Sequence, residues 1–256
     1  MKQFFKKSLI KILQPVNSRI GFTLKDGSSD VQVINKNLLL HNFFSILAQT
    51  QFNPGHIVDV GANHGTWTQK ALQYFPEAYY SLLEPQYWLA DSLKELLSEK
   101  IRFYPIGAGS ESGSFRFTIV NRDDSCSFRY TKEQAVKKGF QQLDLPVERL
   151  DEFLISRSLP VPDIIKIDAE GLDLEVLKGA GPYLGKTEVF LVEAAVNNLQ
   201  LNNTVLKVIE FMDNKGYRLF DLTDINRPFK PSVLWLVELA FIKKDGFVSH
   251  NVNILT

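Results

Sequence analysis

Short apolar runs alternate along this chain with segments of helical periodicity. Several of the runs are apolar throughout, as expected for strands that are covered on both faces of a parallel sheet. The predicted strands are residues 56–60, 79–84, 101–106, 162–168, 187–194 and 216–222. The predicted helices are residues 66–75, 86–99, 172–178 and 204–214. Strand and helix repeated in this order predict a doubly wound α/β sheet.

Two further strand signals lie outside this alternation. The apolar run at 234–244 leaves no room for a helix after the strand at 216–222, so it predicts an antiparallel last strand. Residues 114–120 and 140–150 predict an inserted strand pair around the polar loop 121–130.

The chain before Gly55 has a different pattern. An apolar helical run at residues 31–48 predicts a helical cap on the sheet domain. We therefore divide the chain into an N-terminal helical segment, residues 1–54, and a main domain, residues 55–256.

The N-terminal sequence MKQFFKKSLIKILQPVNSRI mixes basic and apolar positions. Lys6, Lys7 and Lys11 interrupt an apolar run that is too short to span a bilayer, and no small-residue cleavage site follows it. On a helix, the apolar side chains share one face, and Pro15 ends the run. Two interpretations stay open, a helix packed on the domain and a weak peripheral contact with a membrane.

Composition narrows the functional classes. The 256 residues are 45% hydrophobic and 23% charged, which is enough for one sizeable core. The 29 basic and 29 acidic side chains cancel, so no global field attracts nucleic acid, and we expect no nucleic-acid partner. Cys126 is the only cysteine, which rules out an intramolecular disulfide and suits a reducing, cytoplasmic compartment. Composition leaves the oligomeric state open.

The first predicted strand of the main domain ends in the sequence IVDVGANHGTW. Ligands of open α/β sheets bind at the carboxyl ends of the strands, where this sequence lies. Gly61 and Gly65 let the chain turn tightly and let a ligand approach the backbone at the start of a helix. Their spacing is not the Gly-x-Gly-x-x-Gly of a dinucleotide fold, and Asp59 would repel a diphosphate. A ligand that carries an ammonium and a sulfonium fits better.

The second predicted strand ends in Glu84, roughly 25 residues beyond the first motif. An acid at this position can accept hydrogen bonds from both ribose hydroxyls of an adenosine ligand. An acid after a strand is by itself weak evidence for a ribose contact. Glu84 alone could equally be a solvent-exposed residue at the end of the strand. Together with Asp59, Gly61 and Gly65, which precede it in the sequence, Glu84 indicates that the ligand is S-adenosylmethionine.

Five motifs together resemble the FkbM family of S-adenosylmethionine-dependent methyltransferases. They are DVGANHG at 59–65, EP at 84–85, IGAG at 106–109, VERLDEFL at 147–154 and IKIDAEGLDLEVLKGA at 165–180. The resemblance implies a seven-stranded, Rossmann-like methyltransferase sheet, mostly parallel with the last strand antiparallel. It also implies O-methylation of hydroxyls on carbohydrates or other natural products, without naming the acceptor.

The matching positions extend the predicted cofactor site beyond the residues already named. With the resemblance included, the predicted cofactor-binding residues are Asp59, Gly61, Ala62, Asn63, Gly65, Glu84, Pro85, Gly107, Ala108 and Asp168.

The sequence KIDAEG indicates the catalytic groups. Asp168 and Glu170 follow a buried strand, and Gly171 then lets the chain turn into a helix. Methyl transfer depends on holding an acceptor oxygen against the methyl carbon, and a positioned carboxylate can take the proton of a hydroxyl. Asp168 and Glu170 are therefore the predicted catalytic residues. The structural alternative is that one acid caps the following helix and the other pairs with Lys166.

Weaker signals concern the acceptor. His64, Ser125, Ser127 and Glu193 are candidate substrate-binding residues, although a loop histidine is more often a hydrogen-bonding linker and the serines suit an exposed loop. Asp168, Glu170 and Glu193 would suit Mg²⁺ by type, but no spacing demands a metal, and we expect none.

These observations predict an S-adenosylmethionine-dependent O-methyltransferase that acts on a small molecule or a glycan. Two alternatives stay open. One is a non-catalytic S-adenosylmethionine-binding or scaffold protein on the same fold. The other is a nucleotide-dependent oxidoreductase, against which Asp59 and the glycine spacing argue.

Overall fold

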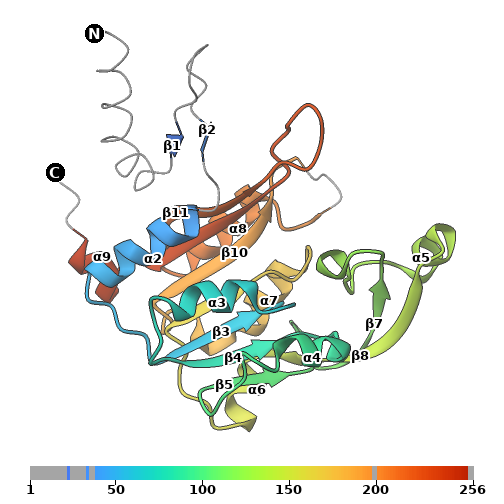
Figure 1. Ribbon diagram of the computed structural model, residues 1–256, viewed down its shortest axis with the longest axis horizontal. Helices are drawn as coiled ribbons and strands as arrows, with labels where there is room; N and C mark the ends of the chain where they lie inside the picture. Colours follow the sequence, from blue (N-terminus) through green and yellow to red (C-terminus); the bar gives the residue numbers. More distant parts are fainter. Residues whose placement is uncertain (1–21, 24–32, 35–37, 198–200, 253–256) are drawn as a thin grey trace, which may run out of the picture.

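The computed structural model describes residues 22–23, 33–34, 38–197 and 201–252. A seven-stranded sheet in the order β11-β12-β10-β9-β3-β4-β5 forms its centre (Figure 1). The strands are β3 (His56–Val60), β4 (Tyr79–Leu83), β5 (Ile101–Tyr104), β9 (Ile164–Ile167), β10 (Val189–Ala195), β11 (Tyr217–Asn226) and β12 (Leu236–Lys243).

The pairing of these strands confirms the predicted sheet. The five strands from β10 to β5 in this order are parallel to one another, whereas β12 is antiparallel to both β10 and β11. The chain runs from β3 to β4 and β5 on one side, and β9 and β10 lie on the other. The strand order therefore reverses between β3 and β9, and such a switch point is where open α/β sheets bind ligands.

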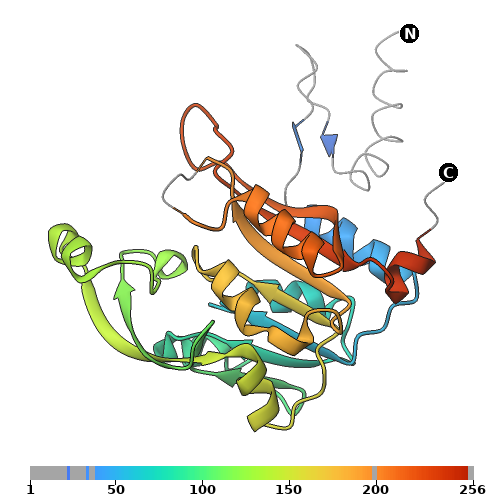
Figure 2. The same ribbon diagram turned by 180° about the vertical axis from the view of Figure 1, so that it is seen from behind.

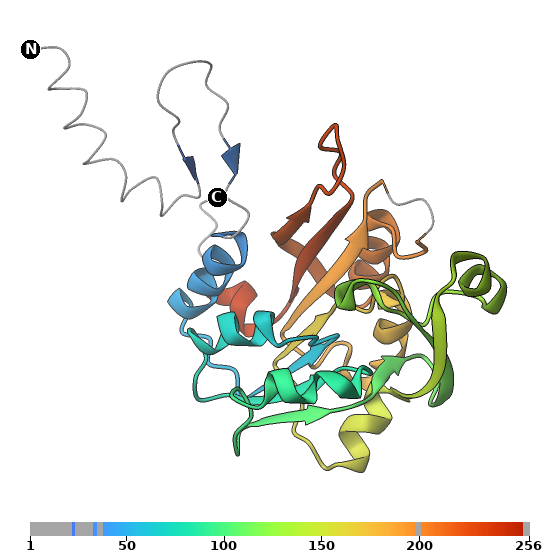
Figure 3. The ribbon, with the colours of Figure 1, turned by 45° about the vertical axis from the view of Figure 1, so that its right-hand side comes forward.

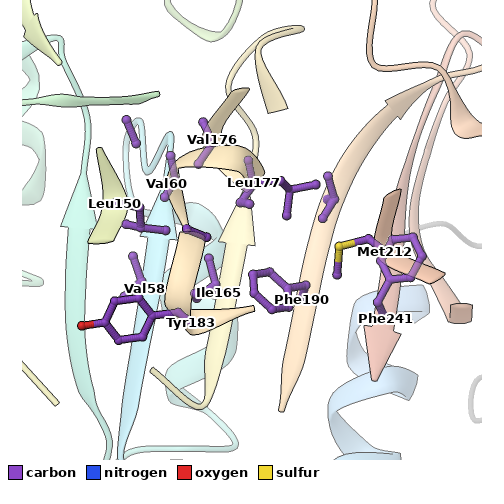
Figure 4. Packing of buried hydrophobic residues seen from close by; sticks show 14 of the residues in the cluster. Val58, Val60, Leu150, Ile165, Val176, Leu177, Tyr183, Phe190, Met212 and Phe241 are labelled. Carbon is purple, nitrogen blue, oxygen red and sulfur yellow. The ribbon is translucent and has the colours of Figure 1, made fainter. Parts of the chain in front are cut away.

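Alternate residues of the central strands bury into two separate cores. Ile57 of β3 and Leu191 of β10 belong to one core, whereas Val58 and Phe190 belong to the other (Figure 4). The first core is covered by α2 (Leu39–Gln49), α3 (Thr66–Leu72), α4 (Ala90–Leu93) and α9 (Phe247–Asn251). The second is covered by α6 (Leu150–Ser156), α7 (Asp173–Gly179) and α8 (Val205–Asn214). Figure 3 shows helices on both sides of the sheet, which is the doubly wound arrangement.

The predicted insert forms a small second sheet. β7 (Gly113–Ile119) pairs antiparallel with β8 (Gln141–Arg149), which confirms the predicted strand pair. β6 (Gly107–Gly109) adds a third strand, and α5 (Lys132–Lys138) lies between β7 and β8; neither was predicted. A capping box between Thr131 and Gln134 starts α5, and this Thr-x-x-Gln spacing was readable in the sequence. Figures 1 and 2 show the insert beside the carboxyl end of β3.

Two predicted helices are shorter than expected. The helix predicted at 86–99 is a 3₁₀ turn followed by α4, and it ends at Leu93. The helix predicted from residue 31 begins only at Leu39, because Val33–Ile34 form the short strand β2, paired with β1 (Phe22–Thr23). Two β-branched neighbours favour a strand over a helix at that point.

Helix α2 packs on the main sheet through Phe43 and Phe44, which are fully buried in the first core. It lies in the segment 1–54, whose boundary with 55–256 remains a prediction. The basic, apolar segment at residues 1–20 lies outside the described residues, so its two interpretations remain open. Within the ranges that the structure describes, no helix has the length and apolarity needed to cross a membrane.

Candidate functional site

Gly61 turns the chain at the carboxyl end of β3. Its φ is +74°, and a Cβ there would lie 1.9 Å from the carbonyl oxygen of Asp168 at the end of β9. The amide of Gly61 also donates to the carbonyl oxygen of Leu83 at 2.9 Å. This glycine therefore makes room for the neighbouring strand end, and it also lines the cavity described below, so its predicted contact with a ligand stays a prediction.

Gly65 serves the fold in a different way. It is the N-cap of α3 with φ of +72°, and a Cβ there would lie 2.6 Å from Leu96 and 2.9 Å from Leu93. It packs under α4 and the turn after it, away from the cavity described below. The expectation that both glycines open the backbone to a ligand therefore does not hold for Gly65.

Asp59 and Lys166 form a buried ion pair between β3 and β9. The Lys166 Nζ lies 3.2 Å from Asp59 Oδ1 and 3.5 Å from Asp168 Oδ2, and it donates to the carbonyl oxygen of Gly61 at 3.0 Å. Thr68 donates to the other carboxylate oxygen of Asp59 at 2.7 Å. Burial alone would lower the pKa of Lys166, but the neighbouring carboxylates raise it above its ordinary value, so the lysine is an ammonium. Asp59 has no exposed surface and meets this ammonium rather than a ligand cation.

Glu84 holds two loops together at the end of β4. Its Oε2 accepts the amide of Asn63 at 3.0 Å, and its Oε1 accepts the amide and the side-chain nitrogen of Gln86 at 3.0 and 3.1 Å. Burial raises the pKa of this carboxyl, although these donors oppose the shift. A carboxylate has about four acceptor positions, so hydrogen-bonding capacity remains for a ligand in the cavity.

One cavity brings together residues from β3, β4, β6, the insert and β9. Those of its lining residues that the sequence predicted are Gly61, Asn63, Glu84, Pro85, Gly107, Ala108, Ser127, Asp168 and Glu170. The predicted residues Asp59, Ala62 and Gly65 do not line it. The cavity lies at the switch point between β3 and β9, as the sheet topology requires.

The insert supplies cavity residues that sequence reasoning missed. Phe117 and Phe128, with ring centroids 4.8 Å apart, form an apolar wall together with Cys126. Gln86 also lines the cavity and donates to the carbonyl oxygen of Asp123 at 3.0 Å, which fixes the insert to the end of β4. No local motif marks these residues, because only the folding of the insert brings them to the sheet edge.

The acids after β9 have separate roles. Asp168 pairs with Lys166, as the structural alternative proposed for one of them, but neither acid caps α7, whose N-cap Leu172 makes no side-chain capping bond. Asp173, the first residue of α7, instead stabilises the turn before the helix. It accepts the amides of Ala169 and Gly171 at 3.0 and 3.2 Å, and burial raises its pKa to about 7. Burial and the charge of Asp168 raise the pKa of Glu170 to about 8. Glu170 thus lines the cavity in a largely protonated form at neutral pH.

Asp168 also faces a second space on the other side of the β9 end. A depression beside the cavity is lined by His64, by Trp67 and Lys70 of α3, by Thr223 of β11 and by Asp168. A smaller pocket adjoins it, and its polar lining consists of Asp168, Glu193, Asp224, Asn226 and Glu238. Asp168 is common to the cavity, the depression and the acidic pocket.

The weaker acceptor candidates are spread over these spaces. His64 bonds to Ser92 Oγ at 2.9 Å, and its Nε2 lies 3.6 Å from Asp123 Oδ2, so it links two loops. Ser127 lines the cavity, whereas Ser125 bonds to Asp124 and does not line it. Glu193 lies in the acidic pocket. Glu238 was missed, although a single acid within the apolar run LWLVELAF was a visible signal.

Comparison with known proteins identifies the chain. Residues 59–219 match the model of the methyltransferase FkbM domain. The chain belongs to the FkbM family. It is therefore an S-adenosylmethionine-dependent methyltransferase, as the five motifs indicated, and the oxidoreductase alternative falls away.

A curated relative is the 2-O-methyltransferase NoeI of Sinorhizobium fredii, which is 25% identical over 166 residues, covering 60% of this chain and 68% of NoeI. Solved structures with a similar fold include precorrin-6y C5,15-methyltransferase from Geobacter metallireducens. It has 15% identity and a TM-score of 0.44, with 87% of this chain and 94% of that chain covered. A second is 1,6-didemethyltoxoflavin-N1-methyltransferase from Burkholderia thailandensis, with 14% identity, a TM-score of 0.42 and 80% and 78% covered.

Proposed function

We propose that this FkbM-family protein transfers a methyl group from S-adenosylmethionine to a hydroxyl of a carbohydrate or a related natural product. The observation that carries the proposal is the position of Asp168, which lines the cavity at the switch point and also both spaces beside it. A carboxylate in this position can contact a bound cofactor from one side and an acceptor from the other.

The cavity residues fit the cofactor in chemical type. Glu84 would accept a ribose hydroxyl at the acceptor position that Asn63 and Gln86 leave open, beside Pro85. The small residues Gly107 and Ala108 and the apolar wall at Phe117 would hold the adenine. Asp168 and Glu170 would face the positively charged end.

The bound cofactor supplies a methyl group on a positively charged sulfur. Asp168 would accept the proton that the acceptor hydroxyl loses as its oxygen takes the methyl group, and the electrons of the broken bond would stay with the sulfur. Lys166 orients this carboxylate through the 3.5 Å ion pair and is itself held by Asp59. Glu170, which lines the same cavity, would orient the ligand by hydrogen bonding. Most of the rate enhancement comes from holding the two reacting atoms together.

The relative NoeI supports oxygen as the acceptor atom, because its name specifies 2-O-methyl transfer.

Incubation with methyl-labelled S-adenosylmethionine and a panel of glycans and hydroxylated metabolites tests the activity. We expect label on a hydroxyl oxygen of at least one carbohydrate. Asp168→Asn should keep cofactor affinity within a few-fold and lower turnover by about 10² or more, whereas Glu170→Gln should lower it less. Calorimetry of cofactor binding and single-turnover rates separate the two quantities.

Asp245→Asn is the matched control, because Asp245 is an exposed acid in the turn after β12. Full turnover in Asp168→Asn would overturn its role as the proton acceptor and leave catalysis to orientation alone. If the cofactor binds and no acceptor receives label, the non-catalytic alternative gains support.

A further inference from the structure

The acidic pocket at the carboxyl ends of β9, β10 and β11 and the amino end of β12 has a composition that the methyl-transfer chemistry does not explain. Its polar lining consists of the carboxylates of Asp168, Glu193, Asp224 and Glu238 and the amide of Asn226. The pocket adjoins the proposed cofactor cavity because Asp168 lines both.

Glu193 and Glu238 lie directly opposite each other in the antiparallel β10–β12 ladder. Directly opposed side chains on one sheet face have Cβ atoms about 4.5–5.5 Å apart, and two like charges at this separation destabilise the sheet. Glu193 Oε2 is inaccessible to solvent and accepts no hydrogen bond within the described part of the chain. Glu238 is nine-tenths buried and accepts only through Oε1, from Thr223 at 2.6 Å, among the hydrogen bonds of the described residues.

The nearest cation, the ammonium of Lys166, forms its ion pairs with other acids. The Lys166 ammonium contacts Asp59, Asp168 and the carbonyl oxygen of Gly61. Among the described residues, no lysine, arginine or histidine lies within ion-pair distance of Glu193 or Glu238. Glu193 and Glu238 therefore keep acceptor oxygens that receive no hydrogen bond from the described part of the chain, and buried polar atoms without partners are costly.

The chemistry of the pocket decides which ligand fits. An ammonium group has three donors, no acceptor and a positive charge, which complements a pocket lined by carboxylates. A metal ion fits less well, since no group of three or more acids, cysteines or histidines among the described residues has the arrangement to hold one. A neutral hydroxyl would satisfy an acceptor but would supply no positive charge to favour the ionised carboxylates.

We propose that the pocket formed by Glu193, Glu238, Asp224 and Asn226 binds a protonated primary amine of the acceptor, so that the preferred acceptor class is an amino sugar or a related amino alcohol. This inference rests on the proposed function, because it places the methylated hydroxyl beside the amine and next to Asp168. Burial raises the pKa of Glu193 well above its ordinary value and that of Glu238 to about 7, and a bound cation would reverse both shifts.

Three probes of matched shape test the inference on the full chain: glucosamine, N-acetylglucosamine and glucose. Their binding is measured by NMR titration in the presence of S-adenosylhomocysteine, and methyl transfer to each is measured with labelled S-adenosylmethionine. We expect glucosamine to bind about tenfold or more tighter than the other two sugars, since a hydrogen bond to a charged group outweighs a neutral one. Glu193→Gln and Glu238→Gln should each remove this preference without changing cofactor affinity.

Glu210→Gln is the control, because it removes an exposed acid from α8 outside the pocket and should leave the preference intact. Equal binding of the three sugars, no binding of glucosamine, or an amine preference that survives both pocket variants would overturn the inference. Methylation of glucose with equal or greater efficiency would also overturn it, while leaving the proposed O-methyltransferase function in place. A preference that appears only with added Mg²⁺ and is lost with EDTA would replace the amine with a metal ion.

Discussion

At the scale of single residues, burial changes what each charged group can do. The sequence places Asp59, Lys166, Asp168 and Glu84 at strand ends without saying which of them a ligand can reach. In the structure Asp59 is sealed behind Lys166, whereas Asp168 is 38% exposed and faces the cavity. Solvent accessibility thus distinguishes Asp168, the proposed catalytic residue, from Asp59, which only holds Lys166. This accessibility depends on the neighbouring strands.

The first residue-scale prediction concerns Glu84. Replacing it with alanine should weaken S-adenosylmethionine binding by about 1.5–3 kcal/mol, because the change removes a charged acceptor for hydroxyl donors. It also releases the amides of Asn63 and Gln86 that position the two loops. Isothermal titration calorimetry measures the affinity, and circular dichroism checks the fold.

Glu77→Ala is the control, since Glu77 is an exposed acid paired with Lys100, before the start of β4. Unchanged affinity in Glu84→Ala would move the ribose contact to another residue.

At the scale of elements, the site depends on the meeting of two strand ends. The turn after β3 passes against the end of β9, so the backbone of Gly61 and the carbonyl of Asp168 are fitted to each other. The insert then adds a wall that belongs to neither strand. A change in the turn therefore alters the position of the catalytic carboxylate as well as the loop itself.

We accordingly expect Gly61→Ala to destabilise the protein and to abolish cofactor binding, with Gly61→Val more severe. A Cβ at 1.9 Å from the Asp168 carbonyl oxygen forces the two strand ends apart, and φ of +74° adds backbone strain. Urea unfolding and calorimetry measure the two effects.

Gly139→Ala separates strain from collision, because Gly139 has a φ of +69° with nothing within 4 Å of a built Cβ. In Gly139→Ala, the free energy of unfolding should fall only by the cost of a left-handed alanine, about 1–2 kcal/mol. The variant should bind the cofactor normally. Equal losses in the two variants would show that the contact with β9 is unimportant.

The element scale also shows where sequence patterns fail. The strand ends and the antiparallel last strand followed from apolar runs, but the end of α4 at Leu93 did not follow from the local pattern. Phe117 and Phe128 could not be assigned to the cavity, since their place depends on the pairing of β7 with β8 across an intervening helix. Long-range packing overrides local preference at such positions.

At the scale of the whole molecule, several buried acids retain protons that the unfolded chain would release. Burial raises the pKa of Glu170 to about 8 and those of Asp173 and Glu238 to about 7. The unfolded carboxyls are ionised well below these values, so the folded state binds more protons near neutral pH. Stability should then fall as pH rises through this range.

We expect a lower melting temperature at about pH 8.5 than at about pH 6.5, where the three acids are still protonated in the folded state. His56 has the opposite effect on stability, because burial lowers its pKa and stability then rises with pH. This rise ends near the ordinary histidine pKa of 6.5, at the lower end of the compared pH range. Thermal unfolding over this range, in the wild type and in Glu238→Gln, measures the slope.

The Glu238→Gln variant should show a shallower slope, because one titrating group is gone, whereas the surface control Glu210→Gln should match the wild type. A melting temperature that is constant or rises across the range would contradict the raised pKa values.

The sequence by itself determined the architecture and the family. Apolar runs of strand length separated by helical periods fix a doubly wound sheet, because each strand must be covered on both faces, and DVGANHG, EP and KIDAEG mark its strand ends. Only the tertiary structure decided which of those residues are accessible. It buried Asp59 against Lys166, placed the Asp173 carboxylate on the amides of the turn before α7, and set Glu193 opposite Glu238. These pairings join residues distant in sequence, and their partners exist only once the strands are side by side, so no local pattern encodes them.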